Sequence, residues 1–311
     1  MGKTAFLFPG QGSQYVGMGK DHFEQNTFVK DIYQAANQIL DYGLTDICFE
    51  GPEETLKQTQ YTQPAIFVHS YLVAKQLVEK GVEVHAVAGH SLGEFSAFAF
   101  AKAFDFESGL KLVQARAKLM SDAGNDSPGS MAAIIGLSPE TVMTICLEAS
   151  EEGVVQPANY NSPVQVVISG SKQGVQKAMD LAKEHNAKRV MELNVSGAFH
   201  SPLMASAVEN FGSELDAIDI EMVSIPLYAN VTASLITDVN EIKTLLQHQL
   251  THPVRWIETI EHMVKDGITT FIEVGPGKVV SGLVKRINRD VNIMQCDTYE
   301  QLEQFDVAAI R

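Results

Sequence analysis

A serine between two glycines is the strongest chemical signal in this sequence. The segment GHSLG (89–93) follows a β-branched, apolar run at 84–88 and precedes an alanine-rich helical pattern. Such a Gly-x-Ser-x-Gly turn between strand and helix exposes its serine, and glycines are needed because larger side chains would collide there. The N–H groups that open the following helix favour negative charge at the serine Oγ. The spacing therefore predicts that Ser91 is a nucleophile.

A base for this serine is predicted at His200. It stands in the segment GAFHSP (197–202), after a predicted strand and before a helix that Ser201 caps. A loop position suits a general base, and a serine followed by a histidine is the chain order of the α/β-hydrolase plan. His90 fits less well, because it lies inside the turn beside the serine instead of facing it.

Arg116 interrupts the apolar face of a predicted helix at 105–120. The positions of that face follow the i, i+3, i+4, i+7, i+8, i+11 rule and are Gly109, Leu112, Val113, Arg116, Ala117 and Met120. An arginine there can snorkel to the surface or pair with a buried carboxylate. If the face borders a pocket, the guanidinium instead offers a fork to an anionic substrate group. Periodicity alone leaves these interpretations open.

A polar loop with two glycines follows the first predicted strand, at 4–8. Its sequence PGQGSQ (9–14) suggests dinucleotide binding, but the third glycine of G-x-G-x-x-G would fall at Tyr15. A Walker A loop is excluded as well, because Gln14 occupies the place of its first glycine. The loop is therefore either a ligand-binding loop at the carboxyl end of a strand or a purely structural turn.

The order of predicted elements divides the chain into two parts. After the turn-forming segment 121–130, the patterns alternate as β-α-β-β-α-β, which is the order of a ferredoxin-like unit. We therefore predict an α/β fold in which residues 1–127 and 197–311 form an α/β-hydrolase-like large subdomain. Residues 128–196 form a ferredoxin-like small subdomain inserted into it.

Two local predictions concern the ends of elements. Proline is favoured at the first position of a helix, so the apolar helix that ends at Gly81 is expected to begin at Pro64. The residues from Asp297 onward are expected to form a loosely held tail.

Composition narrows the functional classes. The chain has 311 residues and a formal net charge of −15, which disfavours nucleic acid as a partner, and it has no apolar run long enough to cross a membrane. Cys48, Cys146 and Cys296 are odd in number and scattered, which favours a reducing cytoplasm over a disulfide framework. His248 and His252 lie one helical turn apart without a glutamate or third ligand, so we expect no metal site.

Together, the motifs resemble those of a known family. FPGQGSQ (8–14), GHSLGE (89–94), Arg116, GAFHS (197–201) and GPGK (275–278) occur in that order. The chain thus resembles malonyl-CoA:acyl carrier protein transacylases, including the free-standing acyltransferases of polyketide synthases, from about residue 4 to residue 295. The resemblance implies the same two-subdomain fold. It also implies malonyl-CoA and an acyl carrier protein as partners, and we expect no cofactor.

The resemblance also implies roles for individual residues. Ser91 is the nucleophile and His200 its base, and the backbone N–H groups of Gln11 and Leu92 form the oxyanion hole. Arg116 holds the malonyl carboxylate in a bidentate pair.

Three further positions take roles from the resemblance. Gln249 matches the residue whose backbone carbonyl orients the histidine, so the site is a dyad and not a triad. Phe199 and His90 belong to the substrate pocket, and Phe199 matches the malonyl-selective pattern. Gly197 departs from the histidine that is common at its place.

Two other functions remain as alternatives. A hydrolase could release acyl groups from carrier proteins with the same dyad, although Arg116 would then bind a carboxylate that ordinary acyl chains lack. A non-catalytic module could keep the fold and only dock a carrier protein, although Ser91, His200 and Arg116 are all present. Carrier proteins are acidic, so docking would need local basic residues, for which the candidates are Lys188 and Arg189 or the stripe of Lys285, Arg286 and Arg289.

Overall fold

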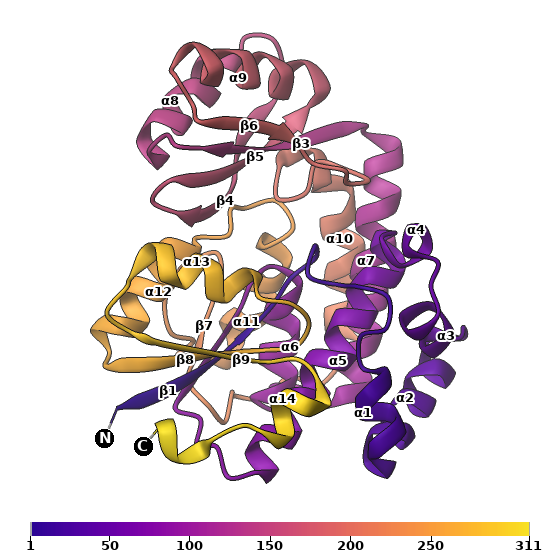
Figure 1. Cartoon of the computed structure of the whole chain (residues 1–311). Coiled ribbons are helices and arrows are strands. Elements are labelled where there is room, and N and C mark those ends of the chain that lie inside the picture. Colours follow the sequence, from indigo (N-terminus) through magenta and orange to yellow (C-terminus); the bar gives the residue numbers. More distant parts are fainter. Residues whose placement is uncertain (1, 311) are drawn as a thin grey trace.

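The computed structural model describes residues 2–310, which form a larger lower part and a smaller upper part (Figure 1). The larger part is built on a sheet with the strand order β7-β2-β1-β8-β9. These strands are β1 (Lys3–Phe8), β2 (Ala86–Gly89), β7 (Leu227–Tyr228), β8 (Ile268–Val274) and β9 (Asn292–Cys296). The pairings between them are parallel. Parallel neighbours need crossover connections, and helices supply them here.

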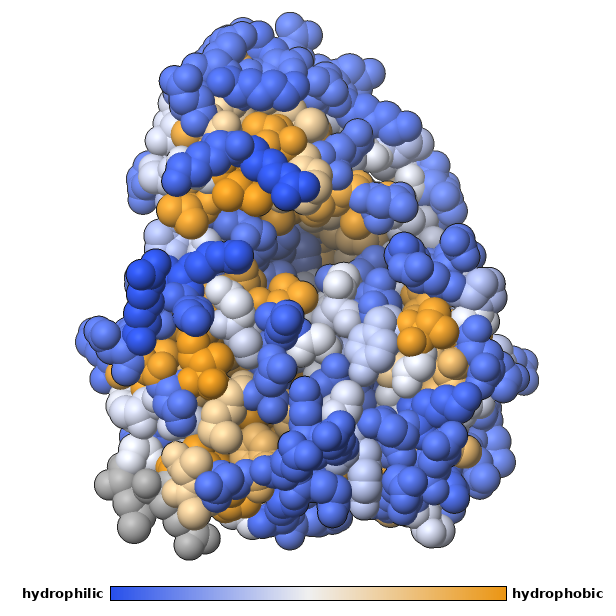
Figure 2. Space-filling view, viewed as in Figure 1, coloured by the Kyte–Doolittle hydropathy of each residue, from blue (hydrophilic) through white to orange (hydrophobic). Residues whose placement is uncertain are grey.

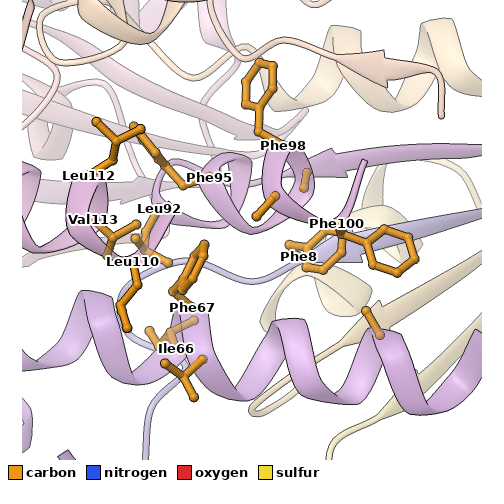
Figure 3. Packing of buried hydrophobic residues seen from close by; sticks show 14 of the residues in the cluster. Phe8, Ile66, Phe67, Leu92, Phe95, Phe98, Phe100, Leu110, Leu112 and Val113 are labelled. Atoms are coloured by element: carbon orange, nitrogen blue, oxygen red, sulfur yellow. The ribbon is translucent and has the colours of Figure 1, made fainter. Parts of the chain in front are cut away.

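Helices cover both faces of this sheet because the strand side chains alternate. In β1, Phe6 and Phe8 join the core under α5 (Thr59–Glu79), α6 (Leu92–Phe100) and α7 (Phe106–Asp126), whereas Ala5 and Leu7 join the core under α12 (Trp256–Lys265) and α13 (Val279–Ile287). Figure 3 shows the first of these cores, with Phe8 and Phe100 side by side. Every residue of α6 is buried, so the helix that follows the serine turn is firmly anchored.

The remaining helices of the larger part lie between its strands, except α14, which follows the last strand. The crossover from β1 to β2 contains α1 (Lys20–Gln25), α2 (Thr27–Leu40), α3 (Leu44–Phe49), α4 (Glu53–Leu56) and α5. Further along the chain come α10 (Ala205–Asp216), α11 (Val239–His248) and α14 (Tyr299–Glu303). No helix within residues 2–310 is both long and apolar enough to span a bilayer.

The smaller part has the predicted β-α-β-β-α-β order. Its elements are β3 (Gly129–Ile135), α8 (Pro139–Ala149), β4 (Val155–Ser162), β5 (Gln165–Ser171), α9 (Lys172–Glu184) and β6 (Arg189–Glu192), and the strands pair antiparallel in the order β4-β5-β3-β6. Serine side chains cap both helices, since Ser138 accepts from the Thr141 N–H and Ser171 from the Gly174 N–H. The α/β class and the ferredoxin-like unit are thus confirmed.

We propose the subdomain boundaries at 127/128 and 196/197, where two connecting segments run between the parts. The segments touch backbone to backbone, because a Cβ on Gly124 would lie 2.4 Å from the Ser196 carbonyl oxygen. Small residues at this crossing are therefore required by the close approach, and Gly197 is one of them.

The prediction for Pro64 was wrong by five residues. Helix α5 begins at Thr59, and Pro64 lies inside it. A proline inside a helix leaves the carbonyl four residues earlier without its usual donor. Here the Tyr42 hydroxyl donates to that carbonyl, on Gln60, at 3.4 Å. A donor distant in sequence thus compensates for the missing bond.

The expectation of a loose tail from Asp297 was also wrong. Asp297 is 8% exposed, and its carboxylate accepts hydrogen bonds from the His69 ring at 2.9 Å and from the Gly277 N–H at 3.0 Å. Helix α14 follows, with a capping box at Thr298, and Leu302 and Phe305 are buried. These contacts hold residues 297–305 against the rest of the large subdomain.

Candidate active site

The serine turn has the strained geometry that its glycines predict. Ser91 adopts φ 50° and ψ −106°, between the end of β2 and the start of α6. A Cβ on Gly89 would lie 2.0 Å from the Gly93 carbonyl group, and one on Gly93 would lie 2.1 Å from the carbonyl oxygen of Phe8. A side chain at Gly89 would force the turn apart, and one at Gly93 would push the turn away from the end of β1, so the glycines allow Ser91 to adopt this conformation there.

Ser91 and His200 form a hydrogen-bonded dyad. The Ser91 Oγ lies 2.8 Å from His200 Nε2, and His200 Nδ1 lies 2.7 Å from the backbone carbonyl oxygen of Gln249. A carbonyl only accepts, so Nδ1 carries the proton and Nε2 presents its lone pair to the serine hydroxyl. The predicted carbonyl contact of Gln249 is therefore present.

Burial keeps His200 neutral. Burial first, and the nearby positive charge of Arg116 second, lower the pKa of His200 to about 3. A neutral imidazole can accept the serine proton at once. The backbone of His200 is also held in place, because Gln156 Nε2 donates to the His200 carbonyl oxygen at 2.8 Å.

Arg116 is fully buried and faces the dyad, so it does not snorkel to the surface. Its Nη2 donates to the Ser91 Oγ at 3.1 Å and to Gln249 Oε1 at 2.7 Å, and its Nη1 donates to Gln63 Oε1 at 2.7 Å. Burial lowers its pKa to about 9, which still leaves it charged at neutral pH. Among residues 2–310 the Arg116 Nε has no partner. The guanidinium is thus held by amides next to the nucleophile, with a donor to spare.

The loop after β1 lies directly against the serine turn. A Cβ on Gly10 would lie 2.4 Å from the His90 carbonyl oxygen, so the loop that carries Gln11 passes the turn at backbone contact. Leu92 is the first residue of α6, where backbone N–H groups have no partner within the helix. Gln11 and Leu92 therefore remain predictions for an oxyanion hole, on two backbones that meet at Ser91.

His90 and Phe199 flank the dyad in different ways. His90 Nε2 lies 2.8 Å from Asn161 Oδ1 on β4, and its ring packs edge-on against Trp256 at 5.4 Å. His90 thus connects the serine turn to the small subdomain. Phe199 is 6% exposed, and a Cβ on Gly197 would lie 3.3 Å from its ring. Their roles in a substrate pocket remain predictions.

Three residues near the dyad were missed in the sequence. Gln63 on α5 binds Arg116, and Asn230 after β7 accepts from the Ser91 N–H at 2.8 Å. Neither belongs to a recognisable motif. Glu94 on α6 is 1% exposed and binds the side chain of Gln249. Glu94 did offer a signal, because a residue three positions after the serine lies on the same helix face.

The site lies where the two subdomains meet. Tyr160 of β4 donates its N–H to the Val254 carbonyl oxygen at 2.9 Å, and Gln156 of the same strand reaches His200. Figure 2 shows the viewed face hollowed between the two parts, with hydrophobic side chains along the upper rim.

His248 and His252 are exposed. The His248 and His252 rings stack at 5.1 Å between centroids. No group of three or more metal-ligating side chains occurs within residues 2–310. The absence of a metal in the reaction remains a prediction.

Comparison with known proteins supports an acyl-transfer site. The family model described as "Acyl transferase domain" matches residues 5–301. The malonyl CoA-acyl carrier protein transacylase of Bacillus subtilis is 44% identical over 304 residues, covering 97% of this chain and 96% of that protein. A crystal structure of an acyl carrier protein S-malonyltransferase from Vibrio cholerae matches with a TM-score of 0.93 at 41% identity, covering 97% of this chain and 99% of the other.

A second solved structure includes a partner. It is a type II polyketide synthase acyl carrier protein in complex with its malonyl-transacylase, and it matches with a TM-score of 0.94 at 37% identity, covering 97% of this chain and 98% of that chain.

Proposed function

This chain belongs to the acyl transferase domain family, and on that basis we propose that it transfers a malonyl group from coenzyme A to the phosphopantetheine thiol of an acyl carrier protein. The observation that carries the proposal is the position of the Ser91 Oγ, which lies 2.8 Å from His200 Nε2 and 3.1 Å from Arg116 Nη2. A nucleophile is thereby in contact with both a base and a cation that suits a carboxylate-bearing acyl group. The product serves fatty-acid or polyketide synthesis.

The first half-reaction loads the serine. His200 Nε2 takes the proton of Ser91 as the Oγ attacks the thioester carbonyl of malonyl-CoA. The tetrahedral oxyanion then collapses, the C–S bond breaks, and His200 returns the proton to the coenzyme A thiolate. The products are a malonyl-Ser91 ester and free coenzyme A, and the histidine is neutral again.

The second half-reaction repeats these steps with a different thiol. The phosphopantetheine thiol of the carrier protein gives its proton to His200 and attacks the ester carbonyl. Collapse breaks the C–O bond, and Ser91 recovers its proton from His200. The cycle is ping-pong, since coenzyme A leaves before the carrier thiol reacts.

The oxyanion formed in both halves is assigned to the backbone N–H groups of Gln11 and Leu92. A donor of this kind contributes about 3 kcal/mol to the transition state. The close approach of the Gly10 loop to the His90 carbonyl supports the assignment, because it brings the two backbones to one side of the turn.

Arg116 affects both which acyl group binds and how basic His200 is. Its positive charge is one cause of the low pKa of His200. When a malonyl carboxylate pairs with the guanidinium, that charge is offset and the pKa of His200 rises, while burial, the larger cause, still lowers it. The carboxylate therefore makes the base stronger as well as anchoring the acyl group. An acyl chain without a carboxylate lacks both effects.

Two measurements test the proposal: malonyl loading of Ser91, and the division of that malonyl group between the carrier thiol and water. Incubation with malonyl-CoA and intact-mass analysis should detect a malonyl adduct on Ser91, and adding holo carrier protein should move that group to the carrier thiol. Predominant release of free malonate would favour the hydrolase alternative. No adduct at all would favour the docking module.

We also propose a reducing cytoplasm as the compartment. Cys48, Cys146 and Cys296 are all buried free thiols in the described chain. Burial raises the pKa of each thiol. Such thiols are protonated and unreactive, as expected of cysteines used for packing where no disulfides form.

A further inference from the structure

Glu94 is a buried carboxyl group for which the mechanism above has no role. It is 1% exposed and lies in the first turn of α6, three residues after Ser91. A buried carboxylate is costly unless hydrogen-bond donors replace its water. The donors that surround Glu94 therefore indicate which parts of the site depend on it.

One carboxylate oxygen holds a residue that braces the serine turn. Glu94 Oε1 accepts the backbone N–H of Asn230 at 2.7 Å. The side chain of Asn230 then accepts the Ser91 N–H at 2.8 Å and donates to the Gly89 carbonyl oxygen at 2.6 Å. Asn230 thus holds the turn on both sides of the nucleophile.

The other oxygen orients Gln249. Its Nε2 donates to Glu94 Oε2 and, at 2.9 Å, to the Ser91 carbonyl oxygen. With both amide protons used, Gln249 Oε1 must point the opposite way, where it accepts from Arg116 Nη2 at 2.7 Å. The backbone carbonyl of the same Gln249 accepts from His200 Nδ1. One residue therefore carries both the contact to the base and the contact to the arginine.

The amide between Glu94 and Arg116 also keeps the two charges apart. None of the ion pairs within residues 2–310 involves Arg116. A direct ion pair would occupy the guanidinium fork and compete with a substrate carboxylate. A carboxylate one amide away offsets the charge of the guanidinium without pairing with it, and the Arg116 Nε keeps a free N–H within residues 2–310.

Resting on the proposed malonyl transfer, we propose that Glu94 is a positioning residue for this reaction. Through Gln249 it orients the Arg116 guanidinium and the carbonyl that directs His200, and through Asn230 it braces the Ser91 turn.

Protonation of Glu94 should make malonyl transfer depend on pH. Burial raises the pKa of Glu94 to about 7, against the lowering effects of Asn230, Gln249 and Arg116, while His200 ionises only at strongly acidic pH. The charged group that faces Glu94 is Arg116 on α7, across the amide of Gln249, with His200 beyond it. When the pH falls through 7, Glu94 gains a proton, and an O–H then competes with the Gln249 N–H. The kcat/KM for malonyl-CoA should therefore decline below about pH 7.

The effect of Glu94 on stability has the opposite sign. Its folded-state pKa is raised, so the folded protein binds this proton more tightly than the unfolded chain does. The stabilising contribution is complete at low pH and is lost as the pH rises through about 7. Activity and stability should thus change in opposite directions over the same pH range, which a merely structural carboxyl group would not produce.

Glu94→Gln tests the proposal. The oxygen of the introduced amide can still accept the Asn230 N–H, but its NH₂ group would face the Nε2 of Gln249, donor to donor. If Gln249 turned over, its own NH₂ group would instead face Arg116. Loss of such a supporting residue typically lowers activity on the order of 10- to 100-fold. We expect that loss in kcat/KM for malonyl transfer at about pH 8, and we expect the decline near pH 7 to disappear.

Glu273→Gln is the matched control. Glu273 is also 1% exposed, and it accepts backbone N–H groups at the start of α13, from Val280 at 3.1 Å and from Ser281 at 2.8 Å. Burial raises its pKa too. Its replacement should change the thermal stability and leave both kcat/KM and the pH profile as in the wild type.

The outcomes separate the two proposals. A wild-type enzyme that transfers malonyl, with a Glu94→Gln variant of equal kcat/KM and an unchanged pH profile, overturns the role of Glu94 and leaves the transfer intact. A wild-type enzyme that transfers no malonyl overturns the proposed function instead. If the glutamine variant does not fold, Glu94→Asp decides. Its shorter side chain reaches one donor at a time, so a lower kcat/KM that still declines with acid supports the proposal, and a wild-type kcat/KM overturns it.

Discussion

The two subdomains bury different kinds of side chains. The core of the small subdomain, between its sheet and helices α8 and α9, consists of hydrophobic side chains such as Ile134, Val166 and Ile168. The large subdomain also buries two charged side chains, Arg116 and Glu94. Both form a hydrogen bond with the side-chain amide of Gln249. Buried charges contribute little to stability, and this pair lies beside Ser91 and His200, so its position favours a role in the chemistry. The comparison assigns the reaction to the large subdomain and packing to the small one.

The small subdomain nevertheless reaches the site through one strand. Gln156 of β4 donates to the carbonyl oxygens of His200 and Thr251, and Asn161 of β4 holds His90. These contacts hold the His200 backbone and the His90 side chain without touching the Ser91 Oγ. Changes in the two subdomains should therefore have graded effects on activity.

Replacement of the nucleophile should give the largest effect. Ser91→Ala removes the atom that carries the acyl group, so malonyl loading should vanish and transfer should fall on the order of 10⁶-fold. The fold should persist. Intact-mass analysis measures malonyl loading, and a thermal melt tests whether the fold is intact. In the small subdomain, Ser171→Ala removes the cap of α9 at a cost of about 1 kcal/mol and should load normally. A malonyl adduct on Ser91→Ala would contradict the assignment.

Replacement of the buried arginine should mainly change selectivity. Arg116→Ala removes the partner of the substrate carboxylate, and loss of such a pair costs about 2–5 kcal/mol. The ratio of kcat/KM for malonyl-CoA over acetyl-CoA should fall on the order of 10²-fold or more. Competition between the two substrates measures it. Arg255→Ala is the control, because Arg255 pairs with Glu258 on a partly exposed helix start and should leave the ratio unchanged. An unaltered ratio in Arg116→Ala would make that arginine structural.

The strand contact across the junction should have a smaller effect. Gln156→Ala removes two hydrogen bonds, at 2.8 and 3.1 Å, to backbone carbonyls beside the base. A loss of about 1–2 kcal/mol corresponds to roughly a 10-fold decrease in kcat. Steady-state kinetics measure it. Gln165→Ala on β5 loses only an exposed contact to Arg286 and should behave as the wild type. Equal rates for the two variants would mean that the small subdomain does not support the base.

A core change in the small subdomain should leave the chemistry almost untouched. Ile168→Ala opens a cavity in its apolar core and should cost about 3 kcal/mol of unfolding free energy. Below the melting temperature, kcat/KM should stay within about twofold of the wild type, since the site residues lie in the other core. Denaturant titration measures the free energy of unfolding, and steady-state kinetics measure kcat/KM. A large loss of kcat/KM in folded protein would show tighter coupling between the subdomains than their contacts suggest.

Several features could be predicted because they depend on neighbours in the chain. Gly89 acts within the serine turn, against the Gly93 carbonyl group, and the capped helices of the small subdomain carry their own serines, Ser138 and Ser171. Strand and helix periods likewise repeat locally. Local signals also misplaced the start of α5. They do not include the Tyr42 hydroxyl, which donates to the Gln60 carbonyl that Pro64 leaves without its usual donor.

The arrangement around Arg116 could not be predicted in this way. Periodicity left its side chain free to reach the surface, a carboxylate or a substrate. The choice depends on Gln63 and Gln249, which lie 53 and 133 residues away in sequence. Only packing of α5, α7 and the end of α11 brings these amides to the guanidinium.

The sequence by itself determined the order of elements and the family resemblance and predicted Ser91 as the nucleophile, because tight turns, caps and periodic patterns are constraints between near neighbours. The tertiary structure alone decided how the groups are charged and oriented: a neutral His200, an Arg116 that forms no ion pair within residues 2–310, and Glu94 joined to both through Gln249. Desolvation and hydrogen-bond direction control these properties. Both depend on which distant segments surround a side chain, and that is set only when the chain has folded.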